Sequence, residues 1–236
     1  MLVSALTDLG RVRRINEDAL HVGGDLLVVA DGMGGHAAGE VASQVAVATI
    51  SAWPDWSVPA QSLRSAFAAA NEAVLDRAAQ DQACAGMGTT MTACYFRNDQ
   101  LFVAHVGDSR LYLHRENELS AVTHDHSVVG ELMRIGTLSE EEARVHPHRN
   151  VLTRALGAGP HLDVDLLTIT LQPVDRLLLC TDGLLNMVNE EEINLILSGC
   201  PAPADATARL VHAANEHGGF DNITIIVADI TKEDLA

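Results

Sequence analysis

Short apolar runs along the chain repeatedly stop or start at an acidic residue. The clearest run covers 27–30 and places Asp31 at a glycine-rich turn, which is the pattern of a buried strand that ends abruptly. Glycines allow close approach to the backbone there, so the turn is a candidate site, although a tight strand-to-helix turn with a solvated acid would look the same. Other acids occupy equivalent positions: Asp108 after 101–107, Asp182 after 177–181, Asp221 before 223–227, and the pair Glu17 and Asp18 before 19–22.

Helical periodicity is confined to two pairs of segments separated by β-rich sequence. Residues 40–52 and 59–81 carry apolar positions three and four residues apart, and 190–197 and 204–217 repeat this pattern. The remaining predicted strands lie in 3–30, in an antiparallel meander over 86–123, and at 164–171, 177–181 and 222–229. This order favours an α+β fold in which two antiparallel sheets pack face to face with helices outside, a four-layer α-β-β-α sandwich.

The segment 127–160 differs from its surroundings because it is charged and poor in core residues. Ser127 to Ile135 and Ser139 to Val145 are predicted to form two short helices, in which Leu132 and Met133 are expected to be packing residues. We expect a mobile flap beside the site. No repeat or linker divides the chain, so 1–236 is predicted to be one domain that includes this flap.

Composition narrows the possible function classes. A hydrophobic share of 47% indicates a globular chain, and a net charge of −17 disfavours non-specific binding to nucleic acid or to an anionic membrane. No signal peptide or long apolar stretch is visible. The four cysteines lack the spacing of a metal finger or a redox pair, which favours free thiols in a reducing compartment and predicts a cytoplasmic protein.

The acids at the strand ends suggest a metal site. Strands of one sheet system share ends, so these carboxylates can meet at one rim, where without counterions they would repel one another strongly. Hard divalent cations remove that repulsion, and a set of oxygen ligands suits Mg²⁺ or Mn²⁺ rather than zinc or copper. Each acid taken alone is also a common turn residue.

Seven motifs in order resemble the metal-dependent serine/threonine protein phosphatases of type 2C, the PPM family, and in particular its small bacterial branch. They cover nearly the whole chain, and a set of that size is highly specific. The motifs are Thr7-Asp8 with Gly10, Arg13 and Asn16-Glu17-Asp18; Ala30-Asp31-Gly32-Met33-Gly34-Gly35-His36; Gly86-Met87-Gly88-Thr89-Thr90; Val106-Gly107-Asp108-Ser109-Arg110; Thr123 with Asp125-His126-Ser127; Cys180-Thr181-Asp182-Gly183; and Asp221-Asn222-Ile223-Thr224.

The resemblance implies a phosphatase that hydrolyses phosphoserine or phosphothreonine by direct attack of a metal-bound water or hydroxide. Two Mn²⁺ or Mg²⁺ ions would occupy a core site, with a third ion held by Asp108 and Asp182. The implied ligands of the core site are Asp31, which bridges both ions, the Gly32 carbonyl, Asp182, Asp221 and, directly or through water, Glu17. Asp18 would hydrogen-bond a metal-bound water.

The resemblance also implies that Arg13 grips the substrate phosphate, a task that suits the bidentate fork of a guanidinium. Some family members carry a histidine directly after the Asp-Gly pair as the acid for the leaving alcohol, whereas this chain has Met33 there. His36, three residues further on, is the remaining candidate for that role, and a structural or solvent-exposed histidine is the alternative.

Two other functions stay open at this stage. A non-catalytic phosphoprotein-binding domain on the same fold would be expected to have lost core ligands, and none is missing here. A metal-dependent hydrolase of small phosphoesters would differ only in its substrate. Our interpretation is a monomeric phosphatase that acts on phosphorylated proteins and opposes a bacterial serine/threonine kinase.

Overall fold

Two antiparallel sheets form the centre of the computed structural model, which describes residues 1–35 and 38–235 apart from the side chains of residues 140 and 141. The first sheet has the strand order β1-β11-β10-β7-β8, with bounds Leu2–Asp8, Ile223–Asp229, Arg176–Cys180, Arg110–Arg115 and Glu118–Ala121. The second has the order β2-β3-β5-β6-β9, with bounds Asp18–Gly23, Leu26–Met33, Met91–Arg97, Gln100–Val106 and Asp165–Thr170, and a short β4 (Gly88–Thr89) pairs with β3.

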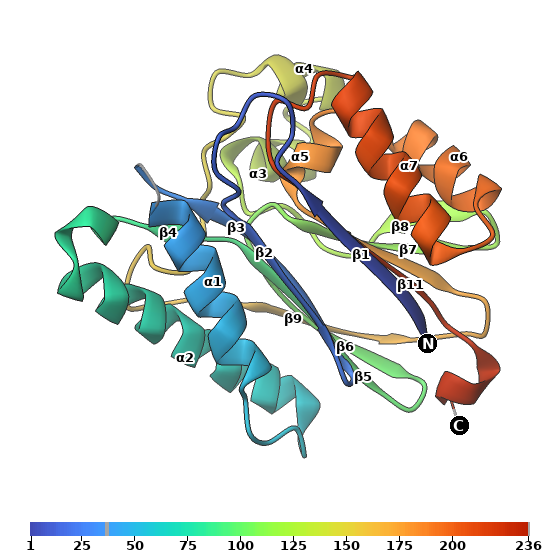
Figure 1. The fold of residues 1–236 in the computed structure, drawn as a ribbon, viewed down its shortest axis with the longest axis horizontal. Coiled ribbons are helices and arrows are strands. Elements are labelled where there is room, and N and C mark those ends of the chain that lie inside the picture. Colours follow the sequence, from blue (N-terminus) through green and yellow to red (C-terminus); the bar gives the residue numbers. More distant parts are fainter. Residues whose placement is uncertain (36–37, 236) are drawn as a thin grey trace.

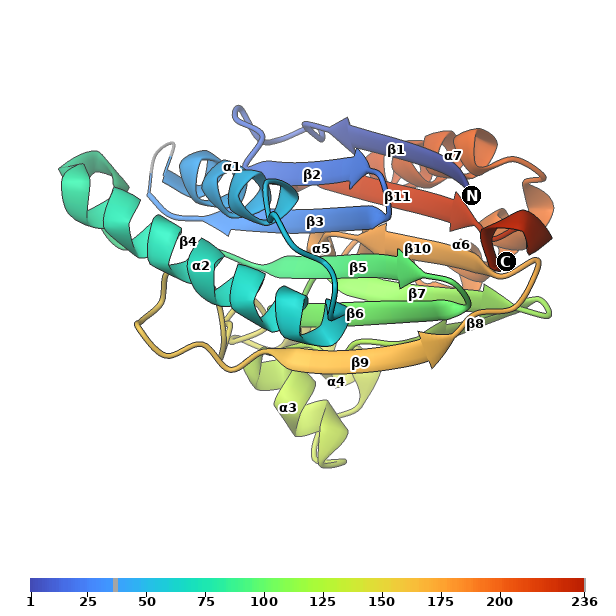
Figure 2. The ribbon, with the colours of Figure 1, turned by 90° about the horizontal axis from the view of Figure 1, so that it is seen from below.

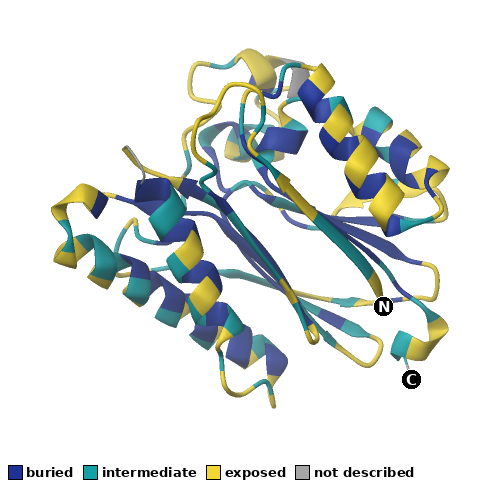
Figure 3. Ribbon diagram, in the orientation of Figure 1, coloured by how far each residue is buried: buried dark blue, intermediate teal, exposed yellow. Residues whose placement is uncertain are grey.

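Helices cover the outer face of each sheet (Figure 1, Figure 2). The helices α1 (Ala38–Ser51) and α2 (Pro59–Gln80) lie on the sheet that contains β3, and α6 (Glu190–Gly199) and α7 (Pro203–Glu216) lie on the other. Figure 3 shows that each of these helices turns a buried stripe to the sheet and an exposed one to solvent. The predicted four-layer α-β-β-α sandwich is therefore confirmed.

The β3 strand shows why the first apolar run has no polar interruption. Leu27 and Val29 point into the core between the two sheets, whereas Val28 and Ala30 point into the core beneath α1 and α2. A strand that is buried on both faces has no solvent side on which a polar residue would be favoured. The same double burial applies to β10, so the runs that end at Asp31 and Asp182 are central strands.

Most predicted elements are present, and two differences concern the residues around the site. The run predicted over 86–96 is divided into β4 and β5, because Thr90 leaves the ladder and its backbone N–H donates to the Asp31 carbonyl. The residues from Asp182 to Leu185 form a one-turn helix, α5, which the sequence analysis did not anticipate because its apolar positions continue those of the preceding strand.

The flap segment contains the two short helices that the sequence predicts, α3 (Val128–Arg134) and α4 (Glu140–Val145). Both begin with a serine that caps the helix, since the Ser127 and Ser139 hydroxyls accept hydrogen bonds from the backbone N–H groups of Gly130 and Glu142. All four cysteines are free and buried, as expected. Within the described residues, no helix is both long and apolar enough to cross a bilayer.

The antiparallel topology brings the acidic strand ends to one end of the sandwich. Asp31 lies opposite Asp18 in the β2–β3 register, so the start of one strand meets the end of the next. Asp108 and Asp182 follow the ends of β6 and β10, and Asp221 precedes β11 at the same end. The chain reverses at each hairpin, and the acids that are far apart in sequence therefore surround one opening.

Candidate active site

A cavity of about 240 Å³ opens at this end of the sandwich. Acidic residues and one arginine form much of its wall, and they come from five separate parts of the chain. The lining includes Arg13, Glu17, Asp31, Gly32, Met33, Thr90, Asp108, Asn150, Asp182 and Asp221. All six predicted metal-ligand residues, including Gly32, therefore border one space.

Asp31 is held by the paired threonines of the β4–β5 turn. Its backbone N–H donates to Thr90 Oγ1 at 2.9 Å, and its carbonyl accepts from Thr89 Oγ1 at 2.8 Å. Thr90 Oγ1 also lies 2.7 Å from Ser109 Oγ, next to Asp108. These buried hydroxyls fix the distance between two acids, a role that the sequence analysis did not assign to them.

Asp18 is the most deeply placed acid of the group, with 8% of its surface exposed. Thr181 Oγ1 donates to Asp18 Oδ2 at 2.9 Å, and Thr181 Oγ1 in turn accepts from the Thr224 backbone N–H at 3.1 Å. This chain of bonds joins the two sheets directly behind Asp182. The Thr181 hydroxyl thus links Asp18, at the start of β2, to the residue that directly precedes Asp182.

Glu17 is positioned through its backbone. Its N–H donates to Asn222 Oδ1 at 2.8 Å, while its carbonyl accepts from Gly32 N at 3.0 Å and from Ser43 Oγ at 2.6 Å. Asn222 Nδ2 reaches back to the carbonyls of Leu9 and Ile15, so one amide anchors the loop that carries Arg13 beside Asp221. Asn222 belongs to the last of the seven motifs, but the sequence did not predict that its side chain holds this loop in place.

The glycines Gly32 and Gly39 allow the end of β3 to pack closely against the start of α1. A Cβ on Gly32 would lie 1.9 Å from the Gly39 carbonyl oxygen and 2.6 Å from the Glu17 carbonyl oxygen. Both contacts are with backbone atoms, so the neighbours cannot rotate away. The absence of a side chain at Gly32 is thus a steric requirement of the site.

Arg13 projects from the loop between β1 and β2 to the rim of the cavity. Its Nη2 donates to Asp221 Oδ2 at 2.8 Å, and its Nη1 lies 3.5 Å from Glu17 Oε2. The side chain keeps 45% of its surface exposed. The guanidinium is therefore held over the acids while part of it faces solvent.

The crowding of carboxyl groups shifts their proton affinities. Burial, followed by the charges of Asp18, Asp182, Asp108 and Asp221, raises the pKa of Asp31 well above its ordinary value. Burial likewise raises the pKa of Asp18 to about 7 and, together with the charge of Asp221, that of Asp182 to about 6. Without cations, the site is strongly unfavourable for its own charges.

The donor set fits hard divalent cations. Within residues 1–35 and 38–235, Glu17 Oε1 and Asp182 Oδ1 are buried and find no hydrogen-bond partner, an arrangement that is costly unless another group binds these oxygens. Among the described residues, no three acidic, histidine or cysteine side chains are gathered closely enough to hold an ion by themselves. Mg²⁺ usually keeps several waters and one or two carboxylates, so carbonyl and water oxygens belong to such a shell.

Two further motif residues of interest are the histidines His36 and His126. His36 lies outside the described residues, so its predicted catalytic role stays a prediction, whereas Met33 lines the cavity. His126 is buried against Asp165, at 3.2 Å, whereas the neighbouring Asp125 pairs with Arg110 at 2.6 Å. The two adjacent residues thus serve different partners and are not arranged as the base and orienting acid of a catalytic triad.

Comparisons with known proteins agree with this site. The family model described as protein phosphatase 2C matches residues 11–219. The protein phosphatase PhpP of Streptococcus pneumoniae is 39% identical over 99% of both chains. The serine/threonine phosphatase Stp1 from Staphylococcus aureus has a structure similar to this one with a TM-score of 0.92, at 33% identity over 98% of this chain and 95% of that one.

A further similar structure is the catalytic domain of the serine/threonine protein phosphatase PstP, in complex with two manganese ions. Its TM-score is 0.91, with 38% identity over 98% of each chain. Family match, sequence identity and fold all lead to the same result, and they cover almost the whole chain. The chain therefore belongs to the protein phosphatase 2C family.

Proposed function

We propose that this protein is a Mn²⁺- or Mg²⁺-dependent phosphatase that hydrolyses phosphoserine and phosphothreonine in proteins. The observation that supports it most directly is the ring of acids around one cavity, with two unpartnered buried carboxylate oxygens beside an exposed guanidinium. The names and the two manganese ions of the related phosphatases point the same way. The intact set of acids disfavours a non-catalytic binding domain.

The metal assignment is the one that the resemblance to the family implies. Asp31 would be shared by two ions, with the Gly32 carbonyl as a further ligand, Asp182 and Asp221 would complete the shell of the first ion, and Glu17 would act on the second, directly or through water. Asp108, which lines the same cavity, would hold a third ion together with Asp182. When bound, such ions supply a water whose pKa falls from about 15.7 towards 7, which makes hydroxide available near neutral pH.

Residues of the chain would bind the substrate phosphate and orient the attacking water. Arg13 is placed to grip phosphoryl oxygens, because its exposed guanidinium is already turned towards the acids by Asp221 and Glu17. Asp18, fixed by Thr181, would orient the water that attacks phosphorus. None of these acids has to serve as a nucleophile or a general base, since each acts as a ligand or a hydrogen-bond partner.

The direct test is hydrolysis of a phosphothreonine peptide by the purified chain with added Mn²⁺ and after chelation. We expect release of phosphate only with metal, and a higher melting temperature with Mn²⁺ because the ions neutralise the crowded acids. Melting provides a readout that does not depend on turnover. Equal hydrolysis in excess chelator, with no shift in melting temperature on adding Mn²⁺, would reject the proposal.

The phosphate clamp gives a prediction of its own. Arg13→Ala should raise KM for the peptide by about tenfold to a hundredfold, because a charge-assisted hydrogen bond contributes about 1.5–3 kcal/mol. Arg14→Ala is the matched control, since Arg14 is equally exposed in the same loop but does not line the cavity. An unchanged KM in Arg13→Ala, or an equal rise in Arg14→Ala, would contradict the clamp role.

The cellular setting is also proposed. A cognate serine/threonine kinase and its targets are the expected phosphorylated partners. The free cysteines favour a reducing compartment such as the cytoplasm. We propose a monomer, because all six predicted metal-ligand residues of this chain border a single cavity, so the site needs no second copy. A hydrolase of small phosphoesters would instead process p-nitrophenyl phosphate with a kcat/KM at least equal to that of phosphopeptides.

A further inference from the structure

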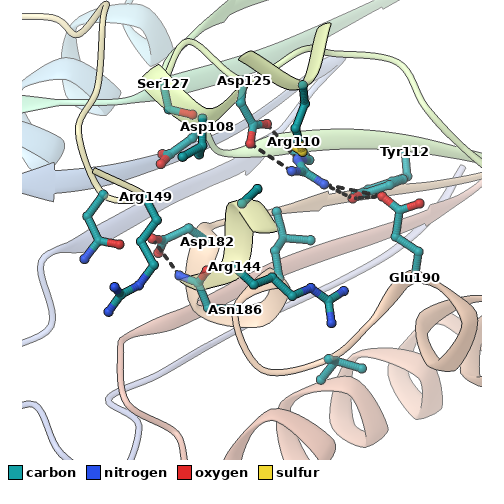
Figure 4. Close-up of a pocket in the computed structure, with 16 residues that line it drawn as sticks. Asp108, Arg110, Tyr112, Asp125, Ser127, Arg144, Arg149, Asp182, Asn186 and Glu190 are labelled. Atoms are coloured by element: carbon teal, nitrogen blue, oxygen red, sulfur yellow. Dashed lines mark hydrogen bonds and ion pairs between the residues drawn. The ribbon is translucent and has the colours of Figure 1, made fainter. Parts of the chain in front are cut away.

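A second cavity, of about 100 Å³, adjoins the cavity of the acids. We call it the flap pocket, because α3 and α4 of the flap form one wall and α5 together with the start of α6 forms another (Figure 4). Asp108, Asn150 and Asp182 line both cavities. A substrate whose phosphate lies among the acids therefore has the flap pocket beside it.

One wall of the flap pocket is apolar, whereas most of its remaining lining is polar or charged. Its apolar side chains come from the flap, from α5 and from the residues that follow α5, and they are Val129, Met133, Ala143, Leu185 and Val188. Met133 and Leu185 are only half-buried, so part of the apolar surface of each side chain is exposed. Met133, which the sequence suggested was a packing residue, borders open space on this side.

The polar end of the flap pocket is closed by its own hydrogen bonds. Arg110 forms a bidentate pair with Asp125, at 2.6 and 2.8 Å, and its Nη1 donates to the Tyr112 hydroxyl at 2.8 Å. That hydroxyl donates to Glu190 Oε1 at 2.8 Å. Figure 4 shows Arg110, Tyr112 and Glu190 joined in this way at one side of the pocket, away from Asp182. A ligand group is thus not needed to satisfy these residues.

We propose that the flap pocket is a specificity subsite that accepts an aliphatic side chain, such as leucine, isoleucine or valine, from a residue next to the phosphorylated serine or threonine. This inference rests on the proposed function. Adjacent Cα atoms lie about 3.8 Å apart, so a neighbour of the phosphorylated residue can reach across the shared wall where the bound peptide turns, since adjacent side chains of a fully extended peptide point to opposite faces. A branched side chain of four carbons suits the volume, because an apolar cavity of about 150 Å³ holds benzene.

Charged side chains fit less well. An acidic side chain would lose its hydration against the apolar wall and would need Arg144 or Arg149, which also line the pocket, as its partner. A lysine or arginine would have to compete with Arg110 and Tyr112 for Glu190, whose Oε1 already accepts from both. Burial of an aliphatic group against Met133 and Leu185 carries neither cost.

The experiment compares phosphothreonine peptides that differ only in the residue before or after the phosphothreonine. With Mn²⁺, a leucine at one of these positions should give a kcat/KM about tenfold higher than serine, as expected for placing one aliphatic side chain in an apolar pocket. A glutamate there should be no better than serine. Equal kcat/KM values for leucine and serine at both positions would overturn the subsite.

Variants on α3 test whether the preference for leucine over serine arises in the flap pocket. Met133→Gln, which keeps the length of the side chain but removes its apolar character, should lower the leucine-to-serine ratio from about ten to about two, and Met133→Leu should retain it. Leu132→Gln is the control, because Leu132 is half-buried on the same helix but does not line the pocket. A ratio that persists in Met133→Gln, or falls equally in Leu132→Gln, would contradict the assignment.

The ratio between two peptides is measured within one protein preparation, so a loss of folded protein does not change it. Failure of the proposed function has a different signature. In that case the wild-type chain would release no phosphate from any phosphopeptide with Mn²⁺ present. That result would reject the phosphatase and the subsite together, whereas phosphate release without preference rejects the subsite alone.

Discussion

Asp182→Asn is expected to lower kcat for a phosphothreonine peptide by about a thousandfold or more at saturating Mn²⁺, since metal ions stabilise the transition state by several kcal/mol. Asparagine keeps the size of the side chain but removes the charge and one of the oxygens. Asp182 Oδ1 is buried without a hydrogen-bond partner in the part of the chain that the structure describes, and Asp182 Oδ2 accepts from Asn186 Nδ2 at 3.0 Å. The substitution therefore removes a proposed cation ligand without creating a cavity.

Two further measurements decide whether this loss reflects metal binding. Asp76→Asn makes the same chemical change on the exposed face of α2 and should leave kcat unaltered. In excess chelator, Asp182→Asn should melt at a higher temperature than the wild type, because one of the crowded charges is gone. A kcat within tenfold of the wild type, or a lower melting temperature in chelator, would show that Asp182 is not a metal ligand.

Gly32→Ala is expected to lower the free energy of unfolding by about 3 kcal/mol or more, the upper part of the range for inserting atoms into a packed region. The new methyl group would overlap the carbonyl oxygens of Gly39 and Glu17, and both belong to backbone that cannot move independently of β2 and α1. Urea denaturation monitored by circular dichroism in chelator measures the loss without a contribution from bound metal.

Gly35→Ala is the control in the same turn. A Cβ at Gly35 would meet no described atom within 4 Å, so the free energy of unfolding of Gly35→Ala should stay within about 0.5 kcal/mol of the wild type. Equal stability of Gly32→Ala and the wild type would show that β3 and α1 can separate without penalty. The close passage of Gly32 against Gly39 would then not be what positions Glu17.

The acids could be found from the sequence because each follows or precedes an uninterrupted apolar run. That pattern arises from burial on both strand faces, and it is local, so periodicity alone was enough to place Asp31, Asp108 and Asp182 at strand ends. The helix α5 was missed because a single turn is too short to establish a helical period. The split between β4 and β5 depends on Thr90 bonding to Asp31, a contact between residues far apart in the chain.

By itself, the sequence determined the sandwich, the positions of the acids and the arginine, and the family to which they belong, because these features are written in residue order and in local hydrophobic period. Only the tertiary structure decided which groups hold the acids in place and what lies beside them. The bond between Thr181 and Asp18 joins residues 163 positions apart, and the flap pocket is assembled from three separate parts of the chain. Such contacts depend on how sheets and helices pack in space, and no spacing along the chain encodes that packing directly.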